Sequence, residues 1–241
     1  MAIGKRALDS IRGILKRYGP SALKKLLWDR EFIDHHWDFI DRTVGDCIYA
    51  YLEKHARYGT VLDLGCGPGN TATELTGDAY QAYIGVDISR AALDKARQRS
   101  EVCGRSERNQ FIQADFVDYV PKGRFDVILF RESLYHVPIR RLKFTLDRYA
   151  EYLGSEGVFI VRLKTLGSQD GREKHRPKAI LNLIARKYDV LEQGRHGDLG
   201  STVVVFRPRR GLNAASGLAS DPVVTRIPAS STEITTDRIS A

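Results

Sequence analysis

The stretch VLDLGCGPGN, residues 61–70, decides the fold of this chain. It begins as an apolar strand, passes Asp63, and then places glycine at every second position, at Gly65, Gly67 and Gly69. Glycine loses more backbone entropy on folding than any other residue, so three in one loop indicate a geometry that a side chain would obstruct. A strand, a glycine loop and a following helix together predict a ligand site.

Bulk composition sets the class of protein. With 241 residues the chain is long enough for one well-buried domain with small additions. It is 42% apolar and 28% charged, as ordinary soluble globular proteins are. No apolar run has the length of a membrane span, and the N-terminus does not resemble a secretory signal. Three cysteines without CxxC spacing argue against a disulfide framework or a zinc site. We therefore expect a cytoplasmic protein without a membrane partner.

The chain is basic, with a net charge of +8 and a pI near 9.4. An anionic partner such as RNA is one interpretation of this excess. A solvated basic surface is the interpretation we favour, because the cations are scattered. The only notable local excess lies between Lys5 and Lys25, where Asp9 is the single acid.

From residue 60 onward, strand patterns alternate with helix patterns. Strands are predicted at 60–66, 83–89, 109–116, 125–133 and 157–164, and helices at 71–76, 90–101, 139–153 and 176–188. The final stretches, DVLEQGRH and STVVVFRPR, are joined by a link containing Gly and Asp and predict a hairpin. Several strands are continuous apolar runs, as expected of strands buried on both faces. The series predicts an α/β fold with a doubly wound, mostly parallel sheet that ends in an antiparallel pair.

Helical patterns precede this series. One is predicted over 7–18, a second from Ser21 as a possible N-cap, and a third over roughly 38–57. We expect 1–58 to form a helical cap on the domain at 59–210. The Ser- and Thr-rich segment 211–241 has no sustained apolar period, and we expect a disordered tail.

Asp63 narrows the choice of ligand. A phosphate-binding P-loop needs a lysine where Asn70 stands, so that class is rejected. A dinucleotide fold needs G-x-G-x-x-G, which the loop matches only in part. A pyrophosphate would be repelled by an unpaired carboxylate beside the loop, whereas a cationic ligand would be attracted. S-adenosylmethionine carries an α-ammonium and a sulfonium and no phosphate, so Asp63 favours it.

Two more acids stand at predicted strand ends. Asp87 ends the second strand, where a carboxylate can accept hydrogen bonds from ribose hydroxyls. Asp115 ends the third strand, where it can accept from an adenine amino group, with the apolar Phe116 against the ring. Strand ends of a parallel sheet meet at one edge. The three acids together with the glycine spacing predict one cofactor site.

On these residues the sequence resembles the class I S-adenosylmethionine-dependent methyltransferases. VLDLGCGPGN, GVDIS and QADFVDY resemble the three cofactor motifs of that family, and FDVILFRESLYHV resembles the segment at its fourth strand. The resemblance covers about 60–165 closely. It implies a Rossmann-like seven-stranded sheet with a terminal hairpin and S-adenosyl-L-methionine as cofactor. It also implies which residues hold the cofactor: Asp63, Gly65, Cys66, Gly67 and Arg131 at the methionine end, Asp87 and Ile88 at the ribose and adenine, and Asp115 and Phe116 at the adenine. We interpret Cys66 as a small residue tolerated between glycines.

The segment RESLYHVP leaves the fourth strand at the predicted cleft and contains the candidate catalytic groups Glu132, Tyr135 and His136. His136 is the first choice for a base, because an unperturbed histidine titrates near neutrality, at about 6.5. The alternative is that Tyr135 and His136 only pack beneath the site, since holding the reactants in line can itself drive methyl transfer. Trp37 is a candidate wall of the acceptor pocket. Two histidines precede it, but adjacent histidines on a helix cannot both point at one metal ion, so we do not expect a metal site.

The leading functional hypothesis is methyl transfer to an oxygen or nitrogen of a small-molecule acceptor. An RNA or protein methyltransferase is the alternative among enzymes, although nucleic acid is the less favoured partner. A non-catalytic module that binds S-adenosylmethionine stays open. A dehydrogenase is disfavoured by Asp63 and by the glycine spacing.

Overall fold

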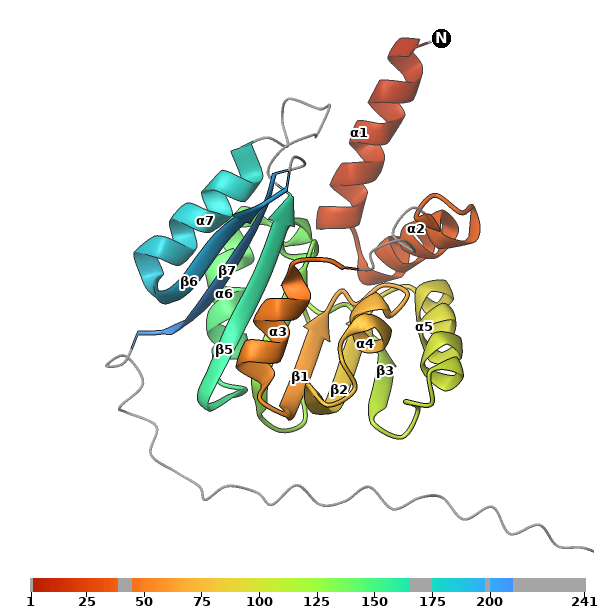
Figure 1. Ribbon diagram of the computed structural model, residues 1–241. Coiled ribbons are helices and arrows are strands. Elements are labelled where there is room, and N and C mark those ends of the chain that lie inside the picture. The colour runs from red at the N-terminus through yellow and green to blue at the C-terminus, as the bar shows by residue number, and fades with distance from the viewer. Residues whose placement is uncertain (1, 39–44, 165–174, 198–199, 210–241) are drawn as a thin grey trace, which may run out of the picture.

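The structure is a computed structural model that describes residues 2–38, 45–164, 175–197 and 200–209. Its centre is a seven-stranded sheet with the order β3-β2-β1-β4-β5-β7-β6 (Figure 1). The strands are β1 (Gly59–Leu64), β2 (Tyr80–Asp87), β3 (Asn109–Gln113), β4 (Phe125–Arg131), β5 (Leu153–Lys164), β6 (Tyr188–His196) and β7 (Ser201–Pro208).

The sheet is parallel from β3 to β5, and β7 runs antiparallel to both of its neighbours. The sheet therefore ends in a β6–β7 hairpin, which confirms the predicted mixed topology. The strand order reverses between β1 and β4, and open parallel sheets bind their ligands at such a switch. The loop that follows β1 lies at this point.

Helices cover both faces of the sheet. They are α1 (Ala2–Tyr18), α2 (Ser21–Ile33), α3 (Ile48–Ala56), α4 (Asn70–Glu74), α5 (Arg90–Val102), α6 (Ile139–Ala150) and α7 (His175–Lys187), with a short 3-10 helix at Leu134–His136. Buried side chains of α3, α4 and α5 pack on one face, and those of α6 and α7 pack on the other. Neighbouring residues of β4 alternate between the two faces, so Val127 and Leu129 join one core while Ile128 and Phe130 join the other. This explains why the middle of the strand, residues 127–130, is apolar throughout.

The glycine loop has the geometry that its sequence predicts. Gly65, Gly67 and Gly69 all have positive φ, at 83°, 54° and 78°. A Cβ on Gly65 would lie 2.5 Å from the Cβ of Ser133, and one on Gly69 would lie 2.7 Å from the Cβ of Ala96. The loop needs glycine both for its backbone conformation and for its tight packing against two other elements.

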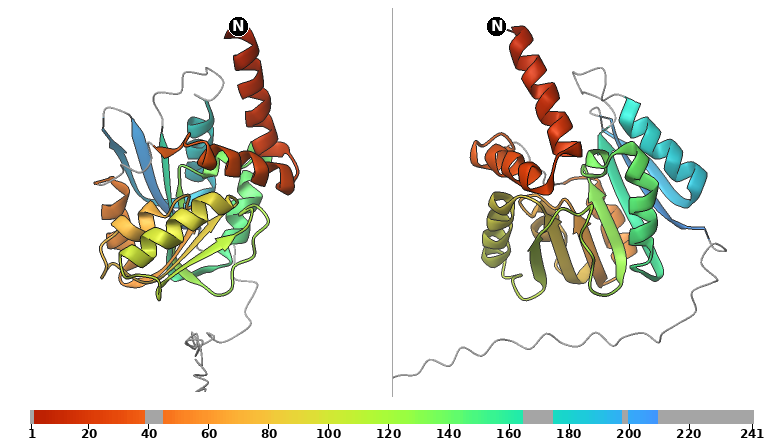
Figure 2. Two further views of the ribbon diagram at one scale, coloured as in Figure 1. Left: turned by 90° about the vertical axis from the view of Figure 1, so that its right-hand side faces the viewer. Right: turned by 180° about the vertical axis from the view of Figure 1, so that it is seen from behind.

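Helices α1 and α2 stand apart from the sheet layers. α2 lies across the ends of the strands near α5, and α1 projects away from the body of the molecule (Figures 1 and 2). The break between them falls at Gly19 and Pro20, as predicted. Ser21 is not the N-cap, which is Pro20. The Ser21 hydroxyl instead donates a hydrogen bond of 3.2 Å to the Asp115 carboxylate, at the end of another strand.

The third predicted helix is too long. The structure has α3 at Ile48–Ala56, preceded by a non-helical turn at 45–47. Residues 39–44, which the prediction also included, lie outside the described residues, as does the predicted tail at 211–241. Ile48, Leu52 and Ala56 are buried against the sheet, so α3 belongs to the layers of the fold. The other predicted helices and strands agree with the structure to within a few residues at each end.

Candidate functional site

Two adjoining pockets open at the carboxyl ends of the central strands. The cap pocket lies under α1 and α2 and is bordered by Lys16, Lys24, Trp28, Phe32, Asp87, Ile88, Asp115, Phe116 and His136, among others. The strand-end pocket lies beside it and is bordered by Asp46, Asp63, Cys66, Asn70, Thr71, Arg162 and Lys164, among others. Six residues border both: Trp37, Gly65, Gly67, Arg131, Glu132 and Tyr135. The pockets therefore meet at the glycine loop and at the segment after β4, the two regions that the sequence singles out.

Asp63 is buried at the end of β1. The Tyr83 hydroxyl donates a 2.6 Å hydrogen bond to its Oδ2 atom, whereas its Oδ1 atom has no hydrogen-bond partner. Burial raises the pKa of this carboxyl to about 6. Leaving a buried polar atom unpaired costs about 1–3 kcal/mol. An unpaired carboxylate oxygen beside the glycine loop fits an incoming cationic donor such as an α-ammonium.

Asp87, at the end of β2, shapes the loop itself. It accepts hydrogen bonds from the backbone N–H groups of Gly67 at 2.9 Å and Ser89 at 2.8 Å. Burial raises its carboxyl pKa to about 6. Each carboxylate oxygen has a further lone pair, so these contacts leave it able to accept from a ligand hydroxyl. Asp87 and Ile88 both border the cap pocket, as the predicted ribose site requires.

Cys66 is buried within the loop, and burial raises the pKa of its thiol. A buried neutral thiol is a weak nucleophile, which supports its interpretation as a small packing residue.

Asp115 is already engaged by the cap. Its Oδ2 atom accepts from the Lys24 ammonium at 2.9 Å and from Ser21, while its Oδ1 atom accepts from the Val117 backbone. Both members of the Lys24–Asp115 ion pair are largely buried. Phe116 borders the pocket next to it. The acid predicted to face an adenine therefore holds α2 over the strand ends.

A second contact holds α2 in the same place. The Ser89 hydroxyl and the Ala91 backbone N–H donate to Asp29 of α2 at 2.8 Å and 3.2 Å. Asp29 thus binds the first turn of α5, where backbone N–H groups have no partner inside the helix. Together with Lys24 it fixes α2 to two separate strand-end loops.

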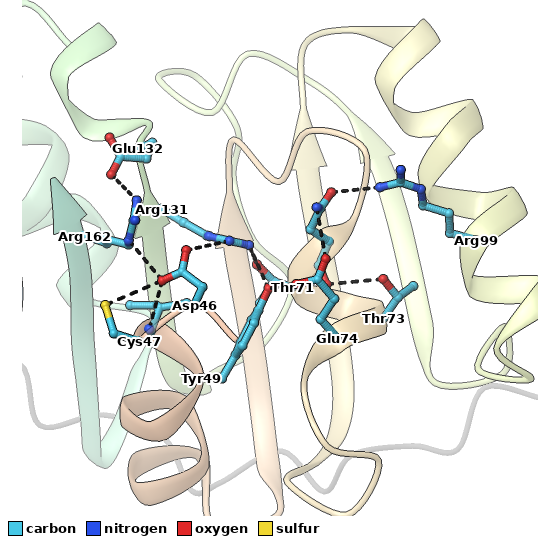
Figure 3. Close-up of polar contacts among 12 residues, drawn as sticks. Asp46, Cys47, Tyr49, Thr71, Thr73, Glu74, Arg99, Arg131, Glu132 and Arg162 are labelled. Atoms are coloured by element: carbon cyan, nitrogen blue, oxygen red, sulfur yellow. Dashed lines mark hydrogen bonds and ion pairs between the residues drawn. The ribbon is translucent and has the colours of Figure 1, made fainter. Parts of the chain in front are cut away.

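Arg131 lies at the centre of a charged network (Figure 3). It donates to Asp46 at 2.7 Å, and Arg162 of β5 pairs with the same carboxylate through its Nε atom at 3.1 Å. Burial opposes ionisation of Asp46, but the two guanidinium groups outweigh it and hold its pKa below the usual range. Arg131 also donates to Tyr49 and to Thr71. The network keeps one guanidinium at the edge of both pockets.

Glu132 has a strained backbone directly after β4. Its φ is +56°, a conformation that costs a residue with a side chain about 1–3 kcal/mol. Its carboxylate accepts from Arg162, from the Tyr135 hydroxyl at 3.0 Å and from the Lys164 backbone at 3.1 Å. Burial raises its pKa, although Arg162 opposes the shift. The strain places a carboxylate and a phenol side by side where the pockets meet.

His136 packs among aromatic side chains, an environment that does not favour the base near neutrality that its residue type predicted. Its ring packs edge-on against Trp28, with the centroids 4.9 Å apart, and against Tyr135 at 4.8 Å. Burial, reinforced by nearby Lys16 and Arg17, lowers its pKa to about 3. His136 is therefore a neutral and weakly basic ring at physiological pH. The reasoning that made it the first choice of base does not hold in this surrounding.

The sequence reasoning missed several residues of the site. Asp46, Arg162 and Lys24 each contribute a buried charge, yet none belongs to a recognised motif. Lys164 and Arg162 alternate with apolar residues near the end of the last parallel strand, which was the available signal. Trp37 borders both pockets, and its indole N–H donates to Glu31, so it does lie where the predicted pocket wall was expected.

Comparison with known proteins gives the family. The methyltransferase domain family matches residues 35–197, which is more than half of the chain. The chain belongs to this family. The resemblance to class I methyltransferases is thereby confirmed, and the fold of the sheet agrees with it.

Curated relatives match over part of their length. Carboxy-S-adenosyl-L-methionine synthase from Desulfotalea psychrophila is 28% identical over 142 residues, which is 55% of this chain and 58% of that protein. Trans-aconitate 2-methyltransferase from Escherichia fergusonii is 34% identical over 104 residues, 43% of this chain and 38% of that protein. The chain spans about half the length of the curated relatives that it matches.

Solved structures agree in fold. The N-methyltransferase NodS from Bradyrhizobium japonicum, in complex with S-adenosyl-l-homocysteine, superposes with a TM-score of 0.59 at 17% identity. The alignment covers 76% of this chain and 97% of that chain. At this identity the likeness shows a shared fold.

Proposed function

We propose that this chain is an S-adenosylmethionine-dependent methyltransferase that acts on an oxygen or nitrogen of a small-molecule acceptor. The observation that carries the proposal is the unpaired Oδ1 atom of Asp63, buried beside the glycine loop. Family membership and relatives named as methyltransferases support it. A diphosphate at this place would be repelled by the negative charge of the buried carboxylate.

The residues divide the cofactor between them. In this proposal Asp63 accepts from the α-ammonium, and Arg131 offers its guanidinium to the carboxylate of the methionine end. Asp87 accepts from the ribose hydroxyls, with Ile88 and the backbone of Gly65, Cys66 and Gly67 in contact with the ligand. Asp115 and Phe116 hold the adenine once Lys24 gives way. When bound, S-adenosylmethionine supplies a methyl group activated by a positively charged sulfur.

The chain's own task is then to orient the acceptor and exclude water. α2 and Trp37 cover the strand ends and shield the place where the pockets meet. The Tyr135 hydroxyl donates to Glu132, so it can pass its proton to that carboxylate while its oxygen takes up the proton that the acceptor loses. We propose this pair as the group that takes the proton, with His136 as a packing residue of the wall.

Isothermal titration calorimetry tests the cofactor. We expect S-adenosylmethionine and S-adenosylhomocysteine to bind and NAD to give no heat above dilution. Binding of NAD without binding of S-adenosylmethionine would overturn the proposal.

Turnover is tested by a screen of small-molecule acceptors with S-adenosylmethionine labelled in its methyl group. With an acceptor that is turned over, Tyr135→Phe should lower kcat at least tenfold, in the usual range for loss of a proton-transfer group, while the Kd for S-adenosylmethionine stays unchanged. His136→Asn serves as the comparison and should affect kcat less. Tight cofactor binding with no turnover of any acceptor would favour a binding module instead.

A further inference from the structure

Three of the described apolar side chains of helix α1 face the outside. Ile11, Ile14 and Tyr18 are 54%, 54% and 55% exposed. The polar Lys16, by contrast, faces inward: its side chain is 11% exposed, pairs with Glu31 and lies 3.9 Å from the centroid of the Trp28 ring. An amphipathic helix on the surface of a soluble protein normally buries its apolar side. α1 does the reverse.

The three apolar residues form one strip. Positions 11, 14 and 18 are spaced by three and four residues, so they lie on the same side of a helix, while position 16 lies nearly opposite. We call Ile11, Ile14 and Tyr18 the α1 strip. Both views in Figure 2 show α1 projecting from the body. The strip is therefore more than half exposed, and what the structure describes of the chain does not cover it.

The segment that carries the strip has an excess of positive charge. Between residues 2 and 18 the sequence has five cations, Lys5, Arg6, Arg12, Lys16 and Arg17, and one acid, Asp9. Arg12 is exposed and lies about 100° around the helix from Ile11, whereas Lys16 faces inward. A helix with an apolar strip and a basic flank matches the chemistry of an anionic lipid surface, where apolar side chains enter the acyl boundary and cations remain at the headgroups.

We propose that α1 docks the protein on an anionic lipid surface through the α1 strip, with the helix lying in the plane of the interface. It is a surface contact and not a span: within the described part of the chain, no helix combines the length and apolar character needed to cross a membrane. This goes beyond the proposed methyl transfer and does not depend on it, because it concerns a face outside both pockets.

A second copy of the chain is the competing occupant. Pairing two α1 helices through their strips would bring two segments of excess positive charge together, and like charges at short range repel. An anionic surface neutralises the same charges. Charge therefore favours the lipid.

Co-sedimentation of the full chain with vesicles tests the proposal. We expect binding to vesicles of phosphatidylcholine mixed with phosphatidylglycerol and little binding to phosphatidylcholine alone. Added salt should weaken the binding, because it screens the cations. The double variant Ile11→Gln/Ile14→Gln should weaken it about tenfold or more. Arg12→Gln should weaken it about fivefold.

Matched controls lie on other helices. Phe144 on α6 is 63% exposed, so Phe144→Gln removes an equally exposed apolar side chain far from α1 along the chain. Arg186→Gln on α7 removes an exposed cation. Neither control should change vesicle binding, and all variants should melt at the wild-type temperature.

Three outcomes would overturn the proposal. The first is a wild type that does not sediment with the anionic vesicles, and the second is equal binding of the double variant and Phe144→Gln. The third is a dimer in light scattering that the double variant abolishes, which would assign the strip to a second copy. Calorimetry with S-adenosylmethionine on the same samples keeps this result separate from the proposed function.

Discussion

The cap pocket and the strand-end pocket together form one crevice, and its two ends differ in how their acidic residues are hydrogen-bonded. At β1, Asp63 keeps a buried oxygen without a hydrogen-bond partner. At β3, Asp115 is paired with Lys24 and Ser21 of the cap helix. Both acids follow parallel strands and both were expected to face the same ligand. Under the proposed function, we interpret the first end as open to a cationic donor and the second as closed by a cation that the chain itself supplies.

This contrast has an energetic consequence. An unpaired buried carboxylate oxygen weakens the free protein and gains most when a ligand donates to it. A carboxylate that is already paired must first lose its partner, so its contribution to binding is a difference between two contacts. In the proposed site, the methionine end should therefore provide affinity, and the adenine end should control access.

The largest expected effect is at Asp63. Asp63→Asn removes the charge that faces the α-ammonium, and the Kd for S-adenosylmethionine should rise about 100-fold, because a hydrogen bond to a charged group is worth about 1.5–3 kcal/mol. Calorimetry measures it. Asp126→Asn is the matched control and should leave the Kd unchanged. Asp126 accepts from the backbone N–H of Thr60 at the amino ends of β4 and β1, away from the pockets. An unchanged Kd in Asp63→Asn would show that the unpaired oxygen of Asp63 does not contribute to ligand binding.

The pH dependence of binding is the next largest effect. Burial raises the pKa of both Asp63 and Asp87 to about 6, and the ionised form of Asp63 is the one that binds an ammonium. Affinity should therefore be full above pH 7 and fall as the pH drops through 6. At pH 5 about one tenth of such a carboxyl is ionised, so the Kd should be about tenfold weaker than at pH 7. A Kd that stays constant between pH 5 and pH 7 would show that ligand binding does not depend on the ionisation of either carboxyl.

The smallest effect concerns the closed end. Lys24→Met removes the cation that pairs with Asp115, so the adenine amino group no longer competes with it for the carboxylate. The Kd for S-adenosylmethionine should therefore fall about three- to tenfold. This is near the upper part of the range for a partly buried ion pair. Lys25→Met, an exposed neighbour on the same helix, is the control. Weaker binding in Lys24→Met would show that Lys24 holds the cap over the ligand instead of competing with it.

Much of the fold is predictable because it rests on local signals. The alternation of apolar runs with amphipathic stretches predicted the strands along the chain, their mostly parallel sheet and the final hairpin. Positive φ at Gly65, Gly67 and Gly69 follows from residue type, since glycine is the residue that adopts it without a steric cost. The predicted start of α3 was wrong because the turn at 45–47 interrupts the helix that the apolar spacing predicted over roughly 38–57.

The charged network around Asp46 could not be predicted in the same way. Asp46, Arg131 and Arg162 come from three separate parts of the chain, and only the folded sheet brings them together. The pKa of His136 is a similar case. Its residue type suggests a base near neutrality, but burial against Trp28 of the cap lowers its pKa to about 3.

The sequence by itself determined which residues form the strands, where the glycine loop bends and which acids stand at the strand ends, because each depends on backbone preference and on the period of apolar residues. Tertiary structure alone decided which acid keeps an unpaired oxygen and which pairs with Lys24, and which residues of α1 face outward. Those outcomes depend on contacts between segments that are distant in sequence, and burial and charge act through distance in space.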